Sequence, residues 1–192
     1  MRKAPIETLT EKGLRLEDGQ EFELDAIVFA TGFDAMTGAL KEIDVRTTDG
    51  QSLTEDWEAG PYTMLGVMCA GFPNMFMITG PGSPGVKSQM ILSCEQHVDW
   101  ITDCLAFMRD EGHAAIEPTA ESQFDWTMHV KEVADTTLYP LAASWYMGAN
   151  IPGKPRVFMP YVGGVHNYKK KCDAVAADGY PGFEFTPASN LK

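Results

Sequence analysis

The stretch Met75-Phe76-Met77-Ile78-Thr79-Gly80-Pro81-Gly82-Ser83-Pro84-Gly85 places a short apolar run directly before a loop rich in glycine and proline. An apolar run of this length, bounded by turn residues, predicts a buried strand. Residues 88–109 follow with apolar side chains three and four positions apart, which predicts a long amphipathic helix. Its apolar stripe consists of Ile91, Cys94, Val98, Ile101, Leu105 and Met108. A strand, a loop and a helix in this order are typical of an α/β fold.

Residues upstream of this stretch predict further strands. The turn residues and short apolar runs of residues 6–29 predict a strand meander. It ends in the apolar run Ala26–Ala30, just before Thr31 and Gly32. Such a run is typical of a central parallel strand whose carboxyl end faces a ligand, and equally of a plain core strand and turn. Residues 40–60 are acidic and rich in turn residues, so we expect a surface excursion.

The downstream part predicts two more helices and a long loop. Thr119 is placed to cap a helix that runs to about Asp135, with Glu121 near its positive end. Residues 139–155 hold three prolines and an exposed-looking Trp145-Tyr146 pair, which predicts a loop. A short strand at residues 156–159, a helix to about residue 178 and a tail strand at residues 182–185 complete the pattern.

Composition excludes several classes of protein. A net charge of −12 argues against nucleic-acid partners, because their binding requires clustered Lys and Arg. The one basic run, Lys169–Lys171, is short, and we expect it to be a solvated helix face. No apolar stretch is long enough to span a membrane, and the N-terminus lacks a secretion signal, so we expect a cytoplasmic protein. The cysteines have no metal-binding spacing, and we expect reduced thiols. They are Cys69, Cys94, Cys104 and Cys172.

Two glycine motifs resemble nucleotide-binding loops but lack essential features. Gly80–Gly85 has the letters of a dinucleotide fingerprint, yet Pro81 and Pro84 remove N–H donors from the phosphate cradle, and no acidic strand end follows. Residues 148–155 have the spacing of a phosphate loop, but Pro155 stands where a hydroxyl should bind magnesium. Both motifs therefore predict ordinary turns.

Residue chemistry alone names no reaction. The four histidines form no metal-binding pair, and Ser83 lacks the first glycine of a nucleophile elbow because Pro81 occupies that position. We expect no metal site and no catalytic residue within the chain. The sequence predicts a ligand-binding α/β fragment without a catalytic constellation.

Three stretches resemble Baeyer-Villiger monooxygenases of the phenylacetone and cyclohexanone type. They are residues 24–34 (LDAIVFATGFD), 80–100 (GPGSPGVKSQMILSCEQHVDW) and 144–164 (SWYMGANIPGKPRVFMPYVGG). Their order and spacing also match, and the third stretch is the most specific. The resemblance implies an α/β flavoprotein with two dinucleotide-binding domains, of which this chain is the C-terminal part. Residues 1–60 would hold the strand meander and the end of the NADP-side domain, and residues 61–192 the C-terminal part of the FAD domain.

The resemblance also implies cofactors and a reaction. FAD and NADPH would be bound, and ketones would be converted with molecular oxygen to esters or lactones through a flavin peroxide. By matched position, the cofactor-binding residues are Thr31, Gly32, Gln89, Met90 and Trp145. The substrate-binding residues are Gly85, Val86, Lys87 and Pro160. Trp145 matches a tryptophan on a mobile loop that folds over the nicotinamide cofactor, so residues 139–155 would form a lid.

The family's glycine fingerprints, signature motif and active-site arginine have no counterpart in this sequence. We therefore expect the isolated chain to be inactive, and aggregation-prone or dependent on a partner because core surface would be exposed. Two alternatives remain open. One is a non-enzymatic module that completes a separately encoded N-terminal half, and the other is an independent small nucleotide-binding protein.

Overall fold

A computed structural model describes residues 5–30, 32–142 and 144–190. The chain divides into two compact units, Met1–Gly32 and Phe33–Lys192. In the first unit, β1 (Ile6–Thr10), β2 (Gly13–Leu16) and β3 (Glu21–Glu23) form an antiparallel sheet in sequence order. The predicted meander is therefore confirmed over these strands. The assignment of residues 1–60 and 61–192 to two cofactor domains stays a prediction.

The predicted buried strand Ala26–Ala30 was wrong for this chain. These residues are extended but unpaired, and Val28 and Phe29 are 85% and 71% exposed. A parallel strand is buried only where neighbouring strands and covering helices supply hydrogen bonds and apolar contacts. Within residues 5–30 and 32–142 no strand pairs with this run. The apolar side chains of this run therefore remain exposed on the surface.

The predicted strand at residues 75–79 was also wrong, although part of it is buried. Met77 is only 4% exposed and its N–H donates to Val67 O at 2.7 Å, but no ladder forms. Met77 packs instead in a small apolar cluster with Leu53, Trp57, Cys69 and Phe72. Backbone N–H groups of Met77 and Thr79, which donate to Val67 O and to His97 Nδ1, tie the run to the core.

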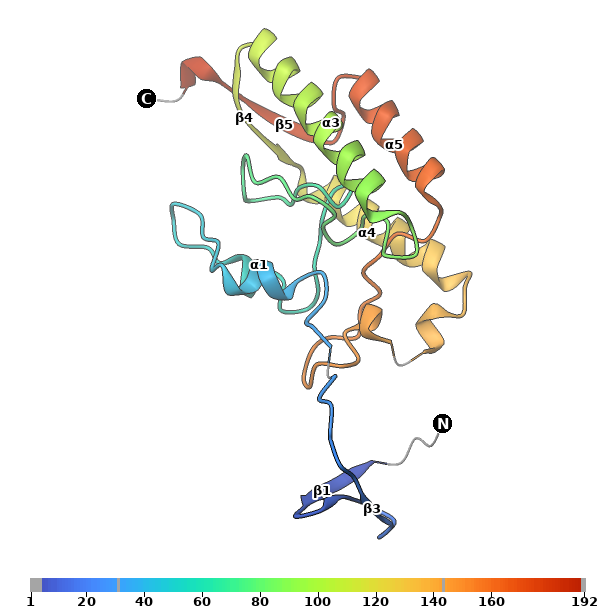
Figure 1. Ribbon diagram of the computed structural model, residues 1–192. Coiled ribbons are helices and arrows are strands. Elements are labelled where there is room, and N and C mark those ends of the chain that lie inside the picture. The colour runs from blue at the N-terminus through green and yellow to red at the C-terminus, as the bar shows by residue number, and fades with distance from the viewer. Residues whose placement is uncertain (1–4, 31, 143, 191–192) are drawn as a thin grey trace. The chain divides into compact units, whose positions relative to one another are not determined.

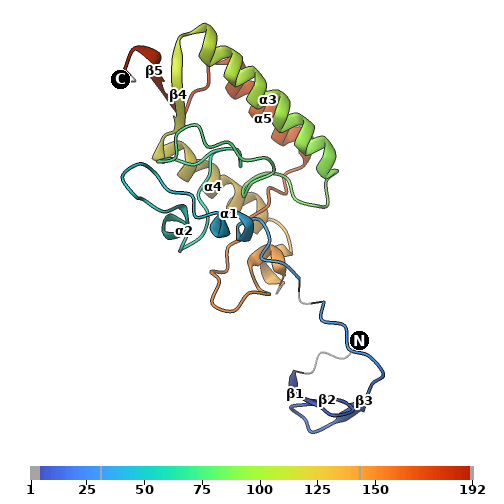
Figure 2. The same cartoon turned by 60° about the vertical axis from the view of Figure 1, so that its left-hand side comes forward.

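The second unit is built around two helices that lie side by side in both views (Figures 1 and 2). These are α3 (Met90–Asp110) and α5 (Val165–Ala177), and Trp100 Nε1 on α3 donates to Cys172 O on α5 at 2.9 Å. The predicted long helix is confirmed, but its buried face differs. Residues facing the core are Ser93, His97, Trp100, Cys104 and Met108.

Half of the predicted apolar stripe of α3 lies outside the core, whereas Met108 is buried and Ile101 packs against the core. Ile91, Val98 and Leu105, each seven residues apart, are 67%, 51% and 49% exposed. Ser93, His97, Trp100 and Cys104 are buried in addition to Met108, because α5 approaches α3 along that neighbouring face. Periodicity identified the helix correctly, whereas only the tertiary contacts decided which face is buried.

A two-stranded sheet and a third helix complete the core. β4 (His113–Pro118) pairs antiparallel with β5 (Phe183–Pro187), with Ile116 opposite Phe185. β5 confirms the predicted tail strand, whereas β4 was missed because His113–Pro118 neither alternates nor contains several β-branched residues. α4 (Ala120–Asp135) begins as predicted, with Thr119 Oγ1 accepting from Ser122 N at 3.0 Å.

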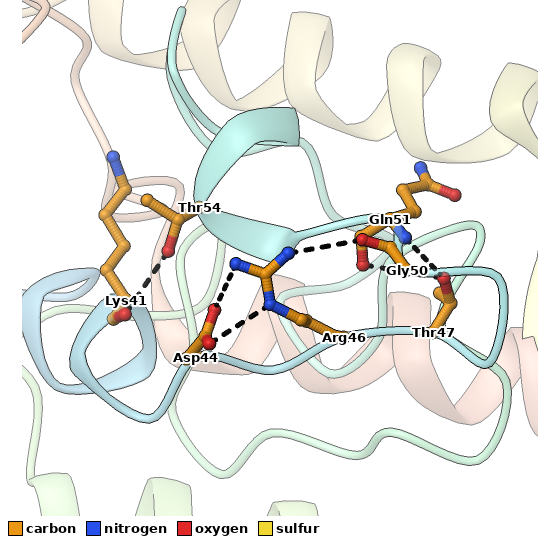
Figure 3. Close-up of polar contacts among 7 residues, drawn as sticks. All are labelled: Lys41, Asp44, Arg46, Thr47, Gly50, Gln51 and Thr54. Atoms are coloured by element: carbon orange, nitrogen blue, oxygen red, sulfur yellow. Dashed lines mark hydrogen bonds and ion pairs between the residues drawn. The ribbon is translucent and has the colours of Figure 1, made fainter.

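Residues 40–60, expected to be a surface excursion, are only partly on the surface, and this region holds two short helices, α1 (Gly38–Glu42) and α2 (Leu53–Asp56). Figure 3 shows Arg46 between Asp44 and Gly50, with Nη1 3.3 Å from Gly50 O. Thr47 Oγ1 accepts from Gln51 N at 3.0 Å and closes the same turn. These turn contacts are local, but the segment also joins the core, because Leu53 and Trp57 are 0% and 2% exposed and pack with Cys69, Phe72 and Met77.

Single-turn 3-10 helices η1 (Tyr139–Leu141) and η2 (Trp145–Met147) interrupt the predicted long loop, and η3 (Ala188–Asn190) follows β5. The predicted strand at residues 156–159 was wrong, since these residues are extended without a ladder. No helix of the described residues has the length and apolar character required to cross a bilayer.

Candidate functional site

The glycine loop at residues 80–85 is tied to two other segments through its backbone. Gly82 N donates to Met159 O at 2.7 Å, and Tyr161 N donates to Ser83 O at 2.8 Å. Trp126 Nε1 on α4 donates to Gly82 O at 3.1 Å. Because these N–H and C=O groups are satisfied within the protein, the loop is not an open phosphate cradle.

Gly85 lies against Pro160 so closely that no side chain fits between them. A Cβ added to Gly85 would lie 2.9 Å from Pro160 Cβ and 3.4 Å from the Tyr146 hydroxyl. The structure therefore brings together two of the predicted substrate-binding residues that are far apart in sequence. The close approach explains why glycine is required at this position.

A cavity of about 250 Å³ opens beside this contact. Three predicted site residues line it: Gly85, Lys87 and Pro160. Its wall also includes Ser88, Thr137, Tyr139, Tyr146, Tyr161, Val162 and Gly164. A concave site with apolar walls and a few polar groups is the common form of a small-molecule pocket. Val86, in contrast, is 54% exposed and does not line the cavity.

Lys87 and two tyrosines give the cavity its polar character. The Lys87 ammonium lies 4.7 Å from the centroid of the Tyr139 ring, within the range of a cation–π contact. A hydrogen bond with Tyr139 raises the pKa of Lys87, which keeps the ammonium charged. Burial raises the pKa of Tyr146, so this hydroxyl stays protonated and can donate a hydrogen bond.

Trp145 lies next to the cavity on η2. Its ring stacks on Tyr146 with centroids 4.2 Å apart and planes 30° apart. The sequence suggested that both rings are exposed, but only Trp145 is, at 39%, whereas Tyr146 is 6% exposed. Ser144 Oγ accepts from Tyr146 N at 3.2 Å, and Gly148 ends the turn at a φ of 69°. One face of Trp145 is thus supported by the protein.

The remaining predicted cofactor-binding residues lie elsewhere. Gln89 is exposed at the N-cap of α3 and Met90 is half-buried in its first turn, and neither lines the cavity. Gly32 belongs to the first unit and has a φ of 81°. Thr31 lies outside the described residues.

Sequence reasoning missed three polar residues that connect the loop at residues 144–155 to the start of the second unit. Lys154 Nζ bonds to Asp34, and Asn150 Nδ2 donates to Phe33 O at 2.9 Å. The partners are 117 to 120 positions apart, so no spacing rule could reveal them. They join the first and third of the stretches that carry the family resemblance.

A second cavity, of about 230 Å³, contains none of the predicted site residues. Its apolar wall includes Tyr62, Met128, Met147 and Phe158, with Arg156 among the lining residues. Among the described residues no group of three or more His, Cys, Asp or Glu side chains could hold a metal ion.

No protein-family model matches the chain. Individual proteins do. A Baeyer-Villiger monooxygenase of Pseudooceanicola batsensis is 44% identical over 176 residues, which are 92% of this chain and 32% of that protein. An FAD-binding monooxygenase of Aspergillus aculeatus is 34% identical over 189 residues, which are 98% of this chain and 32% of that protein.

Solved structures agree with the sequence matches. The crystal structure of cyclohexanone monooxygenase from a Rhodococcus species bound to NADP+ superposes with a TM-score of 0.87 at 41% identity. The superposition covers 96% of this chain and 34% of that structure. The chain therefore spans about a third of the length of the relatives it matches. The α/β fold expected from the sequence is confirmed by this match, apart from the three predicted strands at residues 26–30, 75–79 and 156–159 that do not form.

Proposed function

Since this chain belongs to the Baeyer-Villiger monooxygenase family, we propose that it supplies part of the cofactor and substrate site of an FAD- and NADPH-dependent ketone monooxygenase. The chain corresponds to the C-terminal third of the family members. The observation that carries this proposal is the cavity at which Gly85, Lys87 and Pro160 meet, beside Trp145. The chain by itself would be inactive because the rest of both cofactor sites would come from additional sequence.

The start of α3 fits a flavin ring. No side chain caps its first turn and no acidic residue occupies it, so free N–H groups and the positive end of the helix dipole would be available to the hydrogen-bond acceptor atoms of the ring. Exposed Ile91 and Leu92 add apolar surface beside Gln89 and Met90. In the loop at residues 144–155, Asn150 Oδ1 is buried without a partner among the described residues, which leaves an acceptor for a bound group.

When bound, FAD and NADPH would supply the electrons and the activation of oxygen. The residues of this chain would bind, orient and shield. Gly85 and Pro160 would shape the substrate pocket, the Lys87 ammonium would place a positive charge at its wall, and the protonated Tyr146 hydroxyl would offer a hydrogen bond. Trp145 would close over the nicotinamide and exclude water, as expected for a lid.

A second candidate function is a module without activity of its own that completes a separately encoded N-terminal half. The exposed apolar surface supports it, because large exposed apolar groups in a row are typical of an interface. Within the first unit, Val28 and Phe29 are 85% and 71% exposed. A cytoplasmic location is part of the proposal, and the four free thiols agree with a reducing compartment.

The first experiment is a visible absorption spectrum of the purified chain after incubation with FAD and desalting. The same spectrum is then recorded for the chain co-expressed with the first two thirds of the Pseudooceanicola batsensis monooxygenase. We expect no retained flavin for the chain alone and a yellow complex for the pair. Yellow absorbance of the chain alone would contradict its dependence on further sequence and would call for assays of NADPH oxidation with ketones.

A pair of matched variants tests the flavin contact in the complex. Met90→Glu places a carboxylate where the ring would lie, and Thr102→Glu places one at an exposed position on the same helix. We expect Met90→Glu to lower flavin retention and Thr102→Glu to leave it unchanged. Equal retention in the two variants would contradict the proposed role of the helix start.

A further inference from the structure

We propose that Asp34 and Lys154 form a latch that holds the loop at residues 144–155 in one position and thereby places Trp145. This inference deepens the proposed function, because Trp145 acts as a lid only if that proposal holds. The latch itself is a property of the described residues and requires no cofactor. Asp34 and Lys154 are positioning residues, since neither lines the cavity beside Gly85.

The Lys154 ammonium is fully engaged at the latch. Nζ donates to Asp34 Oδ1, to Thr37 Oγ1 at 2.8 Å and to Ala35 O at 3.2 Å. An ammonium has three donors, so these acceptors use its whole capacity. The Lys154 side chain is 10% exposed and that of Asp34 is 32% exposed, whereas the partners of the other ion pairs in the described residues are 41% exposed or more.

The latch is connected to Trp145 through the loop's own backbone. A Cβ on Gly148 would lie 2.9 Å from Lys154 Cδ, so the aliphatic stem of the lysine packs against the residue that ends η2. Gly148 N donates to Trp145 O at 3.0 Å, and Ala149 N to Ser144 O at 3.1 Å. A shift of Lys154 is therefore transmitted to the turn that carries Trp145.

A second contact holds the same loop at an adjacent point. Asn150 Nδ2 donates to Phe33 O, next to Asp34 in sequence. Asp34 and Lys154 themselves line an open cavity of about 450 Å³, together with Lys41, Glu55 and Glu58. The loop is thus attached along one edge and faces open space on another. Such an arrangement lets one charged pair decide between a docked and a released position.

Hydrogen–deuterium exchange of the loop amides tests the latch in the purified chain without FAD or NADP. Gly148, Ala149 and Ile151 all donate hydrogen bonds within the loop and report its opening. We expect Asp34→Asn to accelerate their exchange about tenfold while exchange within α3 stays unchanged. Lys131→Met is the matched control, because it breaks an exposed pair with Asp135 on α4.

The charge-swapped chain Asp34→Lys with Lys154→Asp separates a latch from a general structural role. We expect the swap to slow loop exchange relative to Asp34→Asn, since the attraction is restored. If Asp34→Asn leaves loop exchange at the wild-type rate, the latch is refuted. If Asp34→Asn also accelerates amide exchange in α3, the charge-swapped chain provides the test. If the swap does not slow loop exchange relative to Asp34→Asn, the latch is refuted as well. Failure of flavin retention alone would refute the proposed function and leave the latch standing.

Discussion

His97 Nε2 lies 2.7 Å from the hydroxyl of Tyr168, in the interior between α3 and α5. Thr79 N donates to His97 Nδ1 at 2.9 Å, so the proton of the neutral ring is on Nε2, which donates to Tyr168. The Tyr168 hydroxyl in turn donates to Leu65 O at 2.5 Å. This chain of hydrogen bonds joins both helices to the segments that precede the glycine loop.

Tyr168→Phe should destabilise the second unit by about 1–3 kcal/mol, because it leaves His97 Nε2 and Leu65 O buried without their partner. Urea unfolding followed by circular dichroism measures the effect. Tyr62→Phe is the control, since Tyr62 is 37% exposed and makes a ring contact with Phe124. Equal unfolding midpoints for the two variants would mean that the buried hydrogen bonds of Tyr168 add no stability.

Stability should fall as pH falls from about 6.5 to about 4. Burial lowers the pKa of His97 to about 4 from an ordinary value of 6.5, so the unfolded chain binds a proton over this range while the folded protein does not. The pKa shift of His97 therefore leaves the unfolding free energy unchanged above pH 6.5. As the pH falls to about 4, it lowers the unfolding free energy by about 3 kcal/mol at most. His97→Gln should flatten the pH dependence of the unfolding free energy between pH 4 and 6.5, and an unchanged dependence would contradict this role of the buried ring.

Thr119→Ala should cost about 1 kcal/mol through loss of the N-cap of α4. Thr102→Ala, at an exposed position within α3, should change the unfolding free energy by less than about 0.5 kcal/mol. Thermal melts of both variants give the comparison. A Thr119 variant as stable as the Thr102 variant would show that Ser122 N finds another acceptor.

Gly85→Ala should destabilise the loop that forms the cavity, because its Cβ would lie 2.9 Å from Pro160 Cβ. Overpacking of this kind typically costs about 1–3 kcal/mol. Val86→Ala, on the neighbouring exposed side chain, is the control. A melting temperature that drops only in the Gly85 variant supports the close approach, and wild-type stability of both would contradict it.

One thiol should react rapidly with Ellman's reagent in the native protein. Burial raises the pKa values of Cys69 and Cys104 to about 12 and that of Cys172 to about 11, so these side chains remain protonated and shielded near neutral pH. Cys94 is only half-buried. Cys94→Ser should abolish the fast phase, and a fast phase that persists would mean that a core cysteine is accessible.

Local sequence predicted those elements that depend on neighbours along the chain. α3 follows from apolar periodicity, and the start of α4 follows from its cap Thr119, because helix hydrogen bonds and caps involve residues only three or four apart. The meander of β1–β3 follows from turn residues at short spacing. The apolar runs 26–30 and 75–79 were wrongly predicted to be strands, because a strand also requires partner strands from other parts of the chain.

The sequence by itself determined the helices, the sharp turns and the family resemblance, because each depends on residue types at close spacing. Only the tertiary structure decided that Gly85 meets Pro160, that Asp34 binds Lys154 and that α3 buries His97 rather than Val98. These contacts join residues far apart along the chain. Their free energy arises from burial and pairing that exist only after the segments have packed together.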